Sequence, residues 1–220
     1  MTKRSALIVW GGWRGHAPLR TSEKLAGFLE EDGFTVDISD DYTRLGDDRT
    51  GTYDLVIPVV TNDVIEPEIV ANLIDAVRAG TGLGGPHGAM ATSFRSSLEF
   101  HFLCGVQFVA HPGNIIDYRV NITRPDDPLV AGVPDFDYRS EQYYLHYDPS
   151  IEILATTTFS GEHDESTTGV VMPVVFKRRF GKGRIFYSAL GHVPEEHDHP
   201  QAQTILRRGL SWAARRTDAS

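Results

Sequence analysis

Histidines stand at the ends of several apolar runs in this sequence, where an α/β protein keeps its functional groups. They are His16 after residues 5–10, His87 after residues 83–86 and His192 after residues 183–189. Neutral imidazoles bind divalent metal ions such as zinc, and imidazoles with near-neutral pKa values also transfer protons. The residue types therefore indicate acid–base or metal-assisted chemistry.

His87 stands in the segment GTGLGGPHGAMATS, residues 80–93. A glycine-rich strand is expected to end there, followed by a sharp turn and a helix. The α/β hydrolases place a nucleophilic serine at such a turn, within the motif G-x-S-x-G. That motif is missing here, and Ser93 lies too far into the expected helix to replace the nucleophile. The turn therefore carries an acid–base group or a metal ligand instead.

The same segment satisfies G-x-G-x-x-G at Gly80, Gly82 and Gly85. The dinucleotide-binding fingerprint follows the first strand of a βαβ unit and opens a helix. Here the glycines come at the end of an expected helix and run through a strand. We therefore expect no nucleotide cofactor.

A second group of polar residues lies in SEQYYLHYDP, residues 140–149. Glu141 and His146 are five positions apart, which puts them on opposite faces of a regular strand, although a turn within the segment would cancel this. The alternative is an exposed strand end whose tyrosines cover the core. We favour that alternative for His146 but not for Glu141.

Other reactive side chains have structural explanations. His101 follows Phe100 on an apolar helix and is expected to be a packed core residue, whereas His111 precedes Pro-Gly in a loop and fits either interpretation. The single cysteine, Cys104, excludes an internal disulfide and a multi-cysteine zinc site. Its apolar neighbours indicate a buried structural thiol.

The order of predicted elements indicates an α/β fold. Expected strands at residues 5–10, 34–38, 54–58 and 83–86 alternate with expected helices at 18–32, 66–79 and 89–103. The second half is strand-like at residues 115–123, 151–159, 170–179 and 183–189, and a helix is expected at residues 201–216. We predict one domain over residues 1–220, a flavodoxin-like three-layer sandwich with a central, mainly parallel sheet and an antiparallel extension. Ligands of such sheets bind beyond the carboxyl ends of the parallel strands, so His16, His87 and His192 should share one rim.

Composition limits the partners. The net charge of −9 argues against nucleic acid as a partner. The apolar run 6–10 is too short for a signal sequence, and no run approaches the length that spans a membrane, so we expect a cytoplasmic protein. The antiparallel extension supplies edge strands that need covering, which favours a homo-oligomer.

These segments together resemble the ThuA-like (trehalose utilisation) family, which has the class I glutamine amidotransferase-like fold. The resemblance rests on the first strand with its glycines and His16, on GTGLGGPHGA, on SEQYY at Glu141 and on PVVFKRRFGKGRIFYSALGH ending at His192. It implies that His87 occupies the position of the amidotransferase cysteine. An imidazole cannot form the thioester intermediate, so glutamine hydrolysis is not expected.

The resemblance also implies a carbohydrate substrate, because the family is associated with the metabolism of disaccharides and sugar derivatives. We expect an enzyme that isomerises or cleaves a keto-sugar or an oxidised disaccharide, with catalytic residues His87, His192, Glu141 and His16. The same four residues are the candidate ligands of a divalent ion, zinc or manganese. Trp13, Tyr143 and His146 are the candidate sugar-binding residues. The alternative is a non-catalytic sugar-binding or regulatory protein that has kept the fold.

Overall fold

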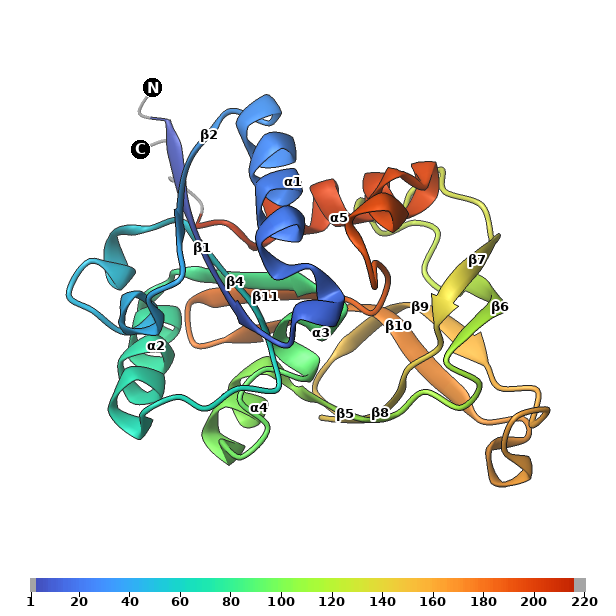
Figure 1. Cartoon of the computed structure of the whole chain (residues 1–220). Coiled ribbons are helices and arrows are strands. Elements are labelled where there is room, and N and C mark those ends of the chain that lie inside the picture. The colour runs from blue at the N-terminus through green and yellow to red at the C-terminus, as the bar shows by residue number, and fades with distance from the viewer. Residues whose placement is uncertain (1–2, 216–220) are drawn as a thin grey trace.

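A mixed nine-stranded sheet forms the centre of the computed structural model, which describes residues 3–215 (Figure 1). The strand order is β2-β1-β3-β4-β11-β10-β9-β6-β7. The parallel strands are β1 (Arg4–Gly12), β2 (Phe34–Ser39), β3 (Leu55–Thr61), β4 (Gly82–Pro86) and β11 (Gly183–Ser188). Residues 6–9 of β1 and all of β3 are buried, because helices cover both faces of these strands.

The antiparallel strands extend this sheet beyond β11. They are β10 (Val171–Phe180), β9 (Glu152–Thr158), β6 (Ile115–Ile122) and β7 (Phe136–Glu141). The predicted hairpin at residues 180–184 joins β10 to β11. A separate two-stranded ladder pairs β5 (Val106–Ala110) with β8 (Tyr144–Tyr147).

Helices form the outer layers. On one face lie α1 (Pro18–Glu31) and α5 (Pro200–Ala213), and on the other lie α2 (Pro67–Ala79) and α4 (Leu98–Cys104) (Figure 1). The short 3-10 helices are η1 (Arg14–His16), η2 (Tyr42–Leu45), η3 (Thr50–Thr52), η4 (Glu165–Thr167) and η5 (Pro194–Asp198). This arrangement confirms the predicted α/β sandwich with an antiparallel extension. No helix in the described part of the chain is both long and apolar enough to cross a bilayer.

The helix expected at residues 89–103 is wrong as a single element. The chain forms a short α3 (Gly88–Ala91), a turn and then α4. Met90 and Phe94 have left-handed backbone conformations, with φ of 74° and 49°, and both side chains are fully buried. Burial of these two side chains therefore outweighs helical propensity. Ser97 then starts α4, because its hydroxyl accepts a hydrogen bond from the backbone N–H of Phe100.

Two further differences affect the antiparallel half and the end of the chain. No expected element covers β5, and the segment 140–149 is not one strand, because β7 ends at Glu141 and β8 begins at Tyr144. The expected last helix ends at Ala213 instead of residue 216, which lies outside the described residues.

Candidate active site

Three histidines meet at the carboxyl ends of the parallel strands. β1 leads into η1, which ends with His16, β4 is followed directly by His87, and β11 leads into the loop that carries His192. The ring centroid of His16 lies 4.9 Å from that of His87 and 4.8 Å from that of His192. The ring centroids of His87 and His192 are 5.3 Å apart. The strand-end argument therefore predicted their meeting place correctly.

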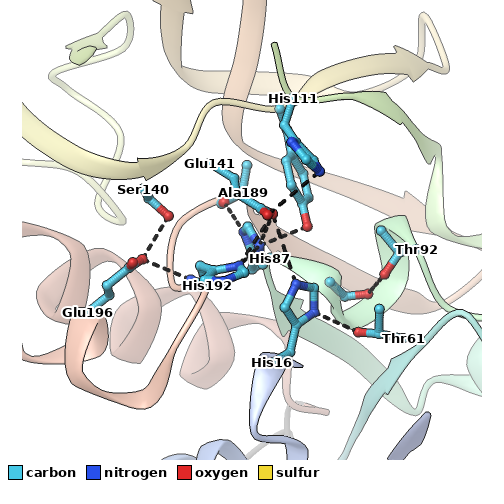
Figure 2. Close-up of polar contacts among 12 residues, drawn as sticks. His16, Thr61, His87, Thr92, His111, Ser140, Glu141, Ala189, His192 and Glu196 are labelled. Atoms are coloured by element: carbon cyan, nitrogen blue, oxygen red, sulfur yellow. Dashed lines mark hydrogen bonds and ion pairs between the residues drawn. The ribbon is translucent and has the colours of Figure 1, made fainter. Parts of the chain in front are cut away.

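Glu141 joins the histidines from the antiparallel half of the sheet (Figure 2). Its Oε2 lies 3.1 Å from Nε2 of His87 and 3.3 Å from Nδ1 of His192. The Nε2 of His16 is 4.0 Å away from the same oxygen. We call His16, His87, Glu141 and His192 the histidine–glutamate cluster.

The surroundings of His87 and His16 determine which ring nitrogens face the cluster. Nδ1 of His87 lies 2.9 Å from the carbonyl oxygen of Ala189, which can only accept a hydrogen bond. Nδ1 therefore donates, and Nε2 is the ring nitrogen that faces Glu141. Nδ1 of His16 is likewise engaged, at 2.8 Å from Oγ1 of Thr61. Partners of this kind orient the histidine ligands of metal ions in proteins.

The turn at His87 has a strained backbone. Its φ is 50°, a left-handed value that costs a non-glycine residue about 1–3 kcal/mol. Two hydrogen bonds fix it: the His87 N–H donates to the carbonyl of Ser188 at 2.6 Å, and the Tyr187 hydroxyl donates to the His87 carbonyl at 2.9 Å. Gly88 follows because a β-carbon there would lie 2.5 Å from Nδ1 of His16. The glycine at position 88 thus allows the rings of His16 and His87 to lie close together.

Electrostatics favours the metal-binding forms of Glu141 and His16. Burial raises the pKa of Glu141, but hydrogen bonds with His192 and His87 outweigh it and hold that pKa well below its usual value. Burial, together with the neighbouring His87 and His192, lowers the pKa of His16 to about 3. Burial also lowers the pKa of His192, but its hydrogen bond to Glu141 outweighs this and the net pKa is raised. At neutral pH the cluster therefore contains a carboxylate and a neutral His16, the forms that a metal ion requires.

The cluster fits a divalent metal ion. Each of its residues offers one ligand atom, and these atoms lie within 4.8 Å of one another. Ligands of one ion bound at about 2.0–2.2 Å lie no more than about 4.4 Å apart, so the cluster has nearly the required size. Three imidazole nitrogens and one carboxylate oxygen suit zinc and other first-row ions.

A cavity of about 370 Å³ opens beside the cluster, and His16 and Glu141 line part of its wall. The other lining residues include three aromatic side chains, two amides and a histidine: Trp13, Phe108, Tyr143, Asn62, Asn114 and His111. Trp13 is about half exposed, at 51%, so its ring is accessible to a ligand. The Tyr143 hydroxyl lies 2.8 Å from Nε2 of His87 and connects the cavity to the cluster.

Comparison with known proteins identifies the family. A family model described as ThuA, trehalose utilisation, matches residues 5–213. The chain belongs to the ThuA family. No sequence among the curated proteins matches this ThuA chain.

Solved structures share the fold of this ThuA chain. A structure described as ThuA-like from Parabacteroides merdae ATCC 43184 has 21% identity and a TM-score of 0.78, covering 96% of this chain and 90% of that one. One from Bacteroides uniformis ATCC 8492 has 18% identity and a TM-score of 0.77, covering 96% and 91%. A β-galactosidase from Bacillus circulans sp. alkalophilus matches over only 30% of its own chain, with 96% of this chain covered, 14% identity and a TM-score of 0.60. At these identities the similarity concerns the fold alone.

The structure of the ThuA chain separates the remaining candidates. Trp13 and Tyr143 line the cavity, whereas His146 is exposed on β8, where it pairs with Gln107 of β5, and does not reach the cavity. His101 is buried and its Nδ1 donates to the carbonyl of Val106 at 3.0 Å, as expected of a core residue.

Several cavity residues were missed or left open by sequence reasoning, among them His111, Thr61 and Asn62. Nε2 of His111 lies 3.6 Å from Oε1 of Glu141, the oxygen of Glu141 that does not contact His87 and His192. Thr61 is the last residue of β3 and Asn62 follows it, because β3 continues three residues beyond the expected end at Pro58. The same strand-end argument would have found these two residues if Val59 and Val60 had been included in the strand.

Proposed function

We propose that this ThuA-family protein is a metal-dependent enzyme that isomerises or cleaves a keto-sugar or an oxidised disaccharide. The observation that carries the proposal is the convergence of His16, His87, Glu141 and His192 beside a cavity with aromatic and amide side chains, of which His16 and Glu141 form part of the wall. The family description, trehalose utilisation, supports a sugar as the substrate.

The cavity offers the contacts that a sugar ring needs. The rings of Trp13 and Phe108 supply flat apolar surfaces, against which the C–H faces of a sugar can pack. Asn62 and Asn114 each supply an amide that both donates and accepts hydrogen bonds, as hydroxyl groups require. A keto-sugar would therefore bind with its carbonyl toward the histidine–glutamate cluster.

The chain's own groups would bind the ion and move protons. His16, His87, Glu141 and His192 would hold the metal ion, which when bound polarises a carbonyl or hydroxyl oxygen. His111 lies on the cavity side of Glu141, and its Nδ1 has no hydrogen-bond partner in the described part of the chain. We assign it the exchange of a proton with carbon next to the carbonyl, where such protons are acidic.

Metal analysis is the first test. Wild type, His87→Ala and His192→Ala should be purified without chelator or histidine tag and analysed by inductively coupled plasma mass spectrometry. Near-stoichiometric zinc or manganese is expected in wild type and should be lost in both variants. His146→Ala is the matched control, because this exposed histidine lies outside the cluster and should keep the ion. Wild type without metal, even after reconstitution, would overturn the metal-dependent part of the proposal.

Substrate screening is the second test. Wild type loaded with zinc or manganese should convert a member of a panel of keto-sugars and oxidised disaccharides. Tight sugar binding with no product under every metal would instead identify a non-catalytic sugar-binding protein.

We also propose a cytoplasmic location and a homo-oligomer. Two structures from Salmonella typhimurium with this fold, at TM-scores of 0.62 and 0.60, are described as cytoplasmic proteins. The sheet ends at two edge strands, β2 and β7. Cell fractionation tests the location, and gel filtration with light scattering tests the assembly, where a clean monomer would overturn it.

A further inference from the structure

Glu196 connects the two segments that bring Glu141 and His192 together. It lies in η5, the short helix that follows the His192 loop. Its Oε2 accepts a hydrogen bond from the backbone N–H of His192 at 2.9 Å and another from the hydroxyl of Ser140 at 2.7 Å. Ser140 directly precedes Glu141 on β7. Oε2 of Glu196 thus links Ser140, the neighbour of Glu141, to the backbone of His192 (Figure 2).

Two further contacts fix the same region. The Tyr138 hydroxyl, also on β7, donates to the backbone carbonyl of Glu196 at 3.2 Å. Below the loop, the buried ring of His197 fills the space beside Gly191, where a β-carbon would lie 2.0 Å from that ring. Gly191 has a φ of 100°, a value that glycine adopts without strain. The loop is therefore fixed by β7 and supported by His197, and Glu196 is the charged member of this arrangement.

We propose that Glu196 is a positioning residue that holds the His192 loop against β7 and so sets the distance between the His192 ring and the Glu141 carboxylate. Glu196 acts through the backbone of His192 and the Ser140 hydroxyl. The part of this inference that concerns metal affinity rests on the proposed function, whereas the part that concerns the loop does not.

Hydrogen exchange in the metal-free protein tests the loop directly. The backbone N–H of His192 is itself a donor to Glu196, so its exchange rate reports that bond. In Glu196→Ala the exchange rate of the His192 backbone N–H should rise by about tenfold or more. Glu196→Gln should restore slow exchange, because both hydrogen bonds go to a single oxygen that the amide oxygen of glutamine can replace. Glu195→Ala is the matched control, since Glu195 is an exposed neighbour in the same helix whose side chain forms a salt bridge with Arg20.

Cobalt binding tests the consequence for the cluster. Loss of partners that orient metal ligands typically weakens metal binding by about 10–100-fold. Competition with a chromophoric chelator should show such a loss of Co²⁺ affinity in Glu196→Ala and a smaller loss in Ser140→Ala, with Glu196→Gln and Glu195→Ala near wild type. The visible spectrum of bound Co²⁺ should also change in Glu196→Ala, which a general loss of stability would not produce.

The outcomes separate the two proposals. If the His192 backbone N–H exchanges at the same rate in Glu196→Ala, Glu195→Ala and wild type, the positioning role of Glu196 is overturned. If Glu196→Ala does not fold, Ser140→Ala decides the point, because it removes one of the two hydrogen bonds and leaves the carboxylate. Wild type that binds no Co²⁺ would overturn the proposed function, while the exchange rates would still decide the role of Glu196.

Discussion

Nδ1 of His87 donates a hydrogen bond to the carbonyl oxygen of Ala189 at 2.9 Å, and this bond turns the other ring nitrogen toward Glu141. The two residues stand directly after neighbouring parallel strands, His87 after β4 and Ala189 after β11. The sheet itself therefore selects the tautomer of the ring.

Gly88→Ala should weaken metal binding by about tenfold or more, because the new methyl group would lie 2.5 Å from Nδ1 of His16 and displace that ring. Titration with Co²⁺ measures the effect. Gly27→Ala in α1 is the matched control, since nothing lies within 4 Å of a β-carbon there. Equal affinities in the two variants would contradict the prediction.

Tyr143→Phe should leave metal affinity unchanged or raise it. The Tyr143 hydroxyl is hydrogen-bonded at 2.8 Å to Nε2 of His87, the nitrogen that a metal ion would use. Loss of this hydrogen bond should lower the stability of the metal-free protein by about 0.5–1.5 kcal/mol. Urea unfolding and Co²⁺ titration separate the two effects. A large loss of affinity would show that the hydroxyl supports the metal site instead of competing with the ion.

Trp13→Ala should weaken sugar binding by up to about tenfold without affecting stability, because the ring is half exposed and lines the cavity. Calorimetry with the sugar found by screening measures the affinity. Tyr147→Ala serves as the control, since this aromatic side chain on β8 is also exposed but does not line the cavity. A loss of the same size in both variants would count against the ring of Trp13 as a sugar contact.

The stability of the metal-free protein should fall as the pH drops below about 6.5. His197 is buried, and burial together with nearby His87 lowers the pKa of its imidazole to about 4. In the unfolded chain this pKa is near 6.5, so between about pH 4 and 6.5 the unfolded state binds more protons. The free energy of unfolding should therefore decrease toward pH 4, by at most about 1.4 kcal/mol per pH unit for this group.

Urea titrations at about pH 7.5 and about pH 5 measure this dependence. His197→Gln should make it shallower, whereas His146→Gln should not, because His146 is exposed. His16, with its pKa of about 3, contributes with the same sign in both variants. Identical slopes in wild type and His197→Gln would show that His197 does not carry the effect.

The parallel half of the fold could be predicted from sequence because its apolar runs, helix ends and strand ends follow general rules. His16, His87 and His192 were found together for that reason, since parallel strands bring their carboxyl ends to one edge. The proximity of Glu141 could not be derived in the same way. Its position depends on the break between β7 and β8, which hydrophobic alternation through residues 140–147 does not reveal.

The turn after His87 shows a second limit. Met90 and Phe94 adopt left-handed conformations that non-glycine residues rarely take, and periodicity carries no sign of them. The deep burial of both side chains stabilises this path. Only the packed structure shows that burial, so sequence reasoning extended one helix across the turn.

His16 and His192 are 176 positions apart in the chain, with Glu141 between them. Synthesis on the ribosome delivers His16 early and His192 only after the last strand, β11, has been made. The complete set of ligands therefore cannot exist on a growing chain until that strand has emerged and entered the sheet. Capture of an ion by this set would therefore come late in synthesis, after the earlier strands have been made.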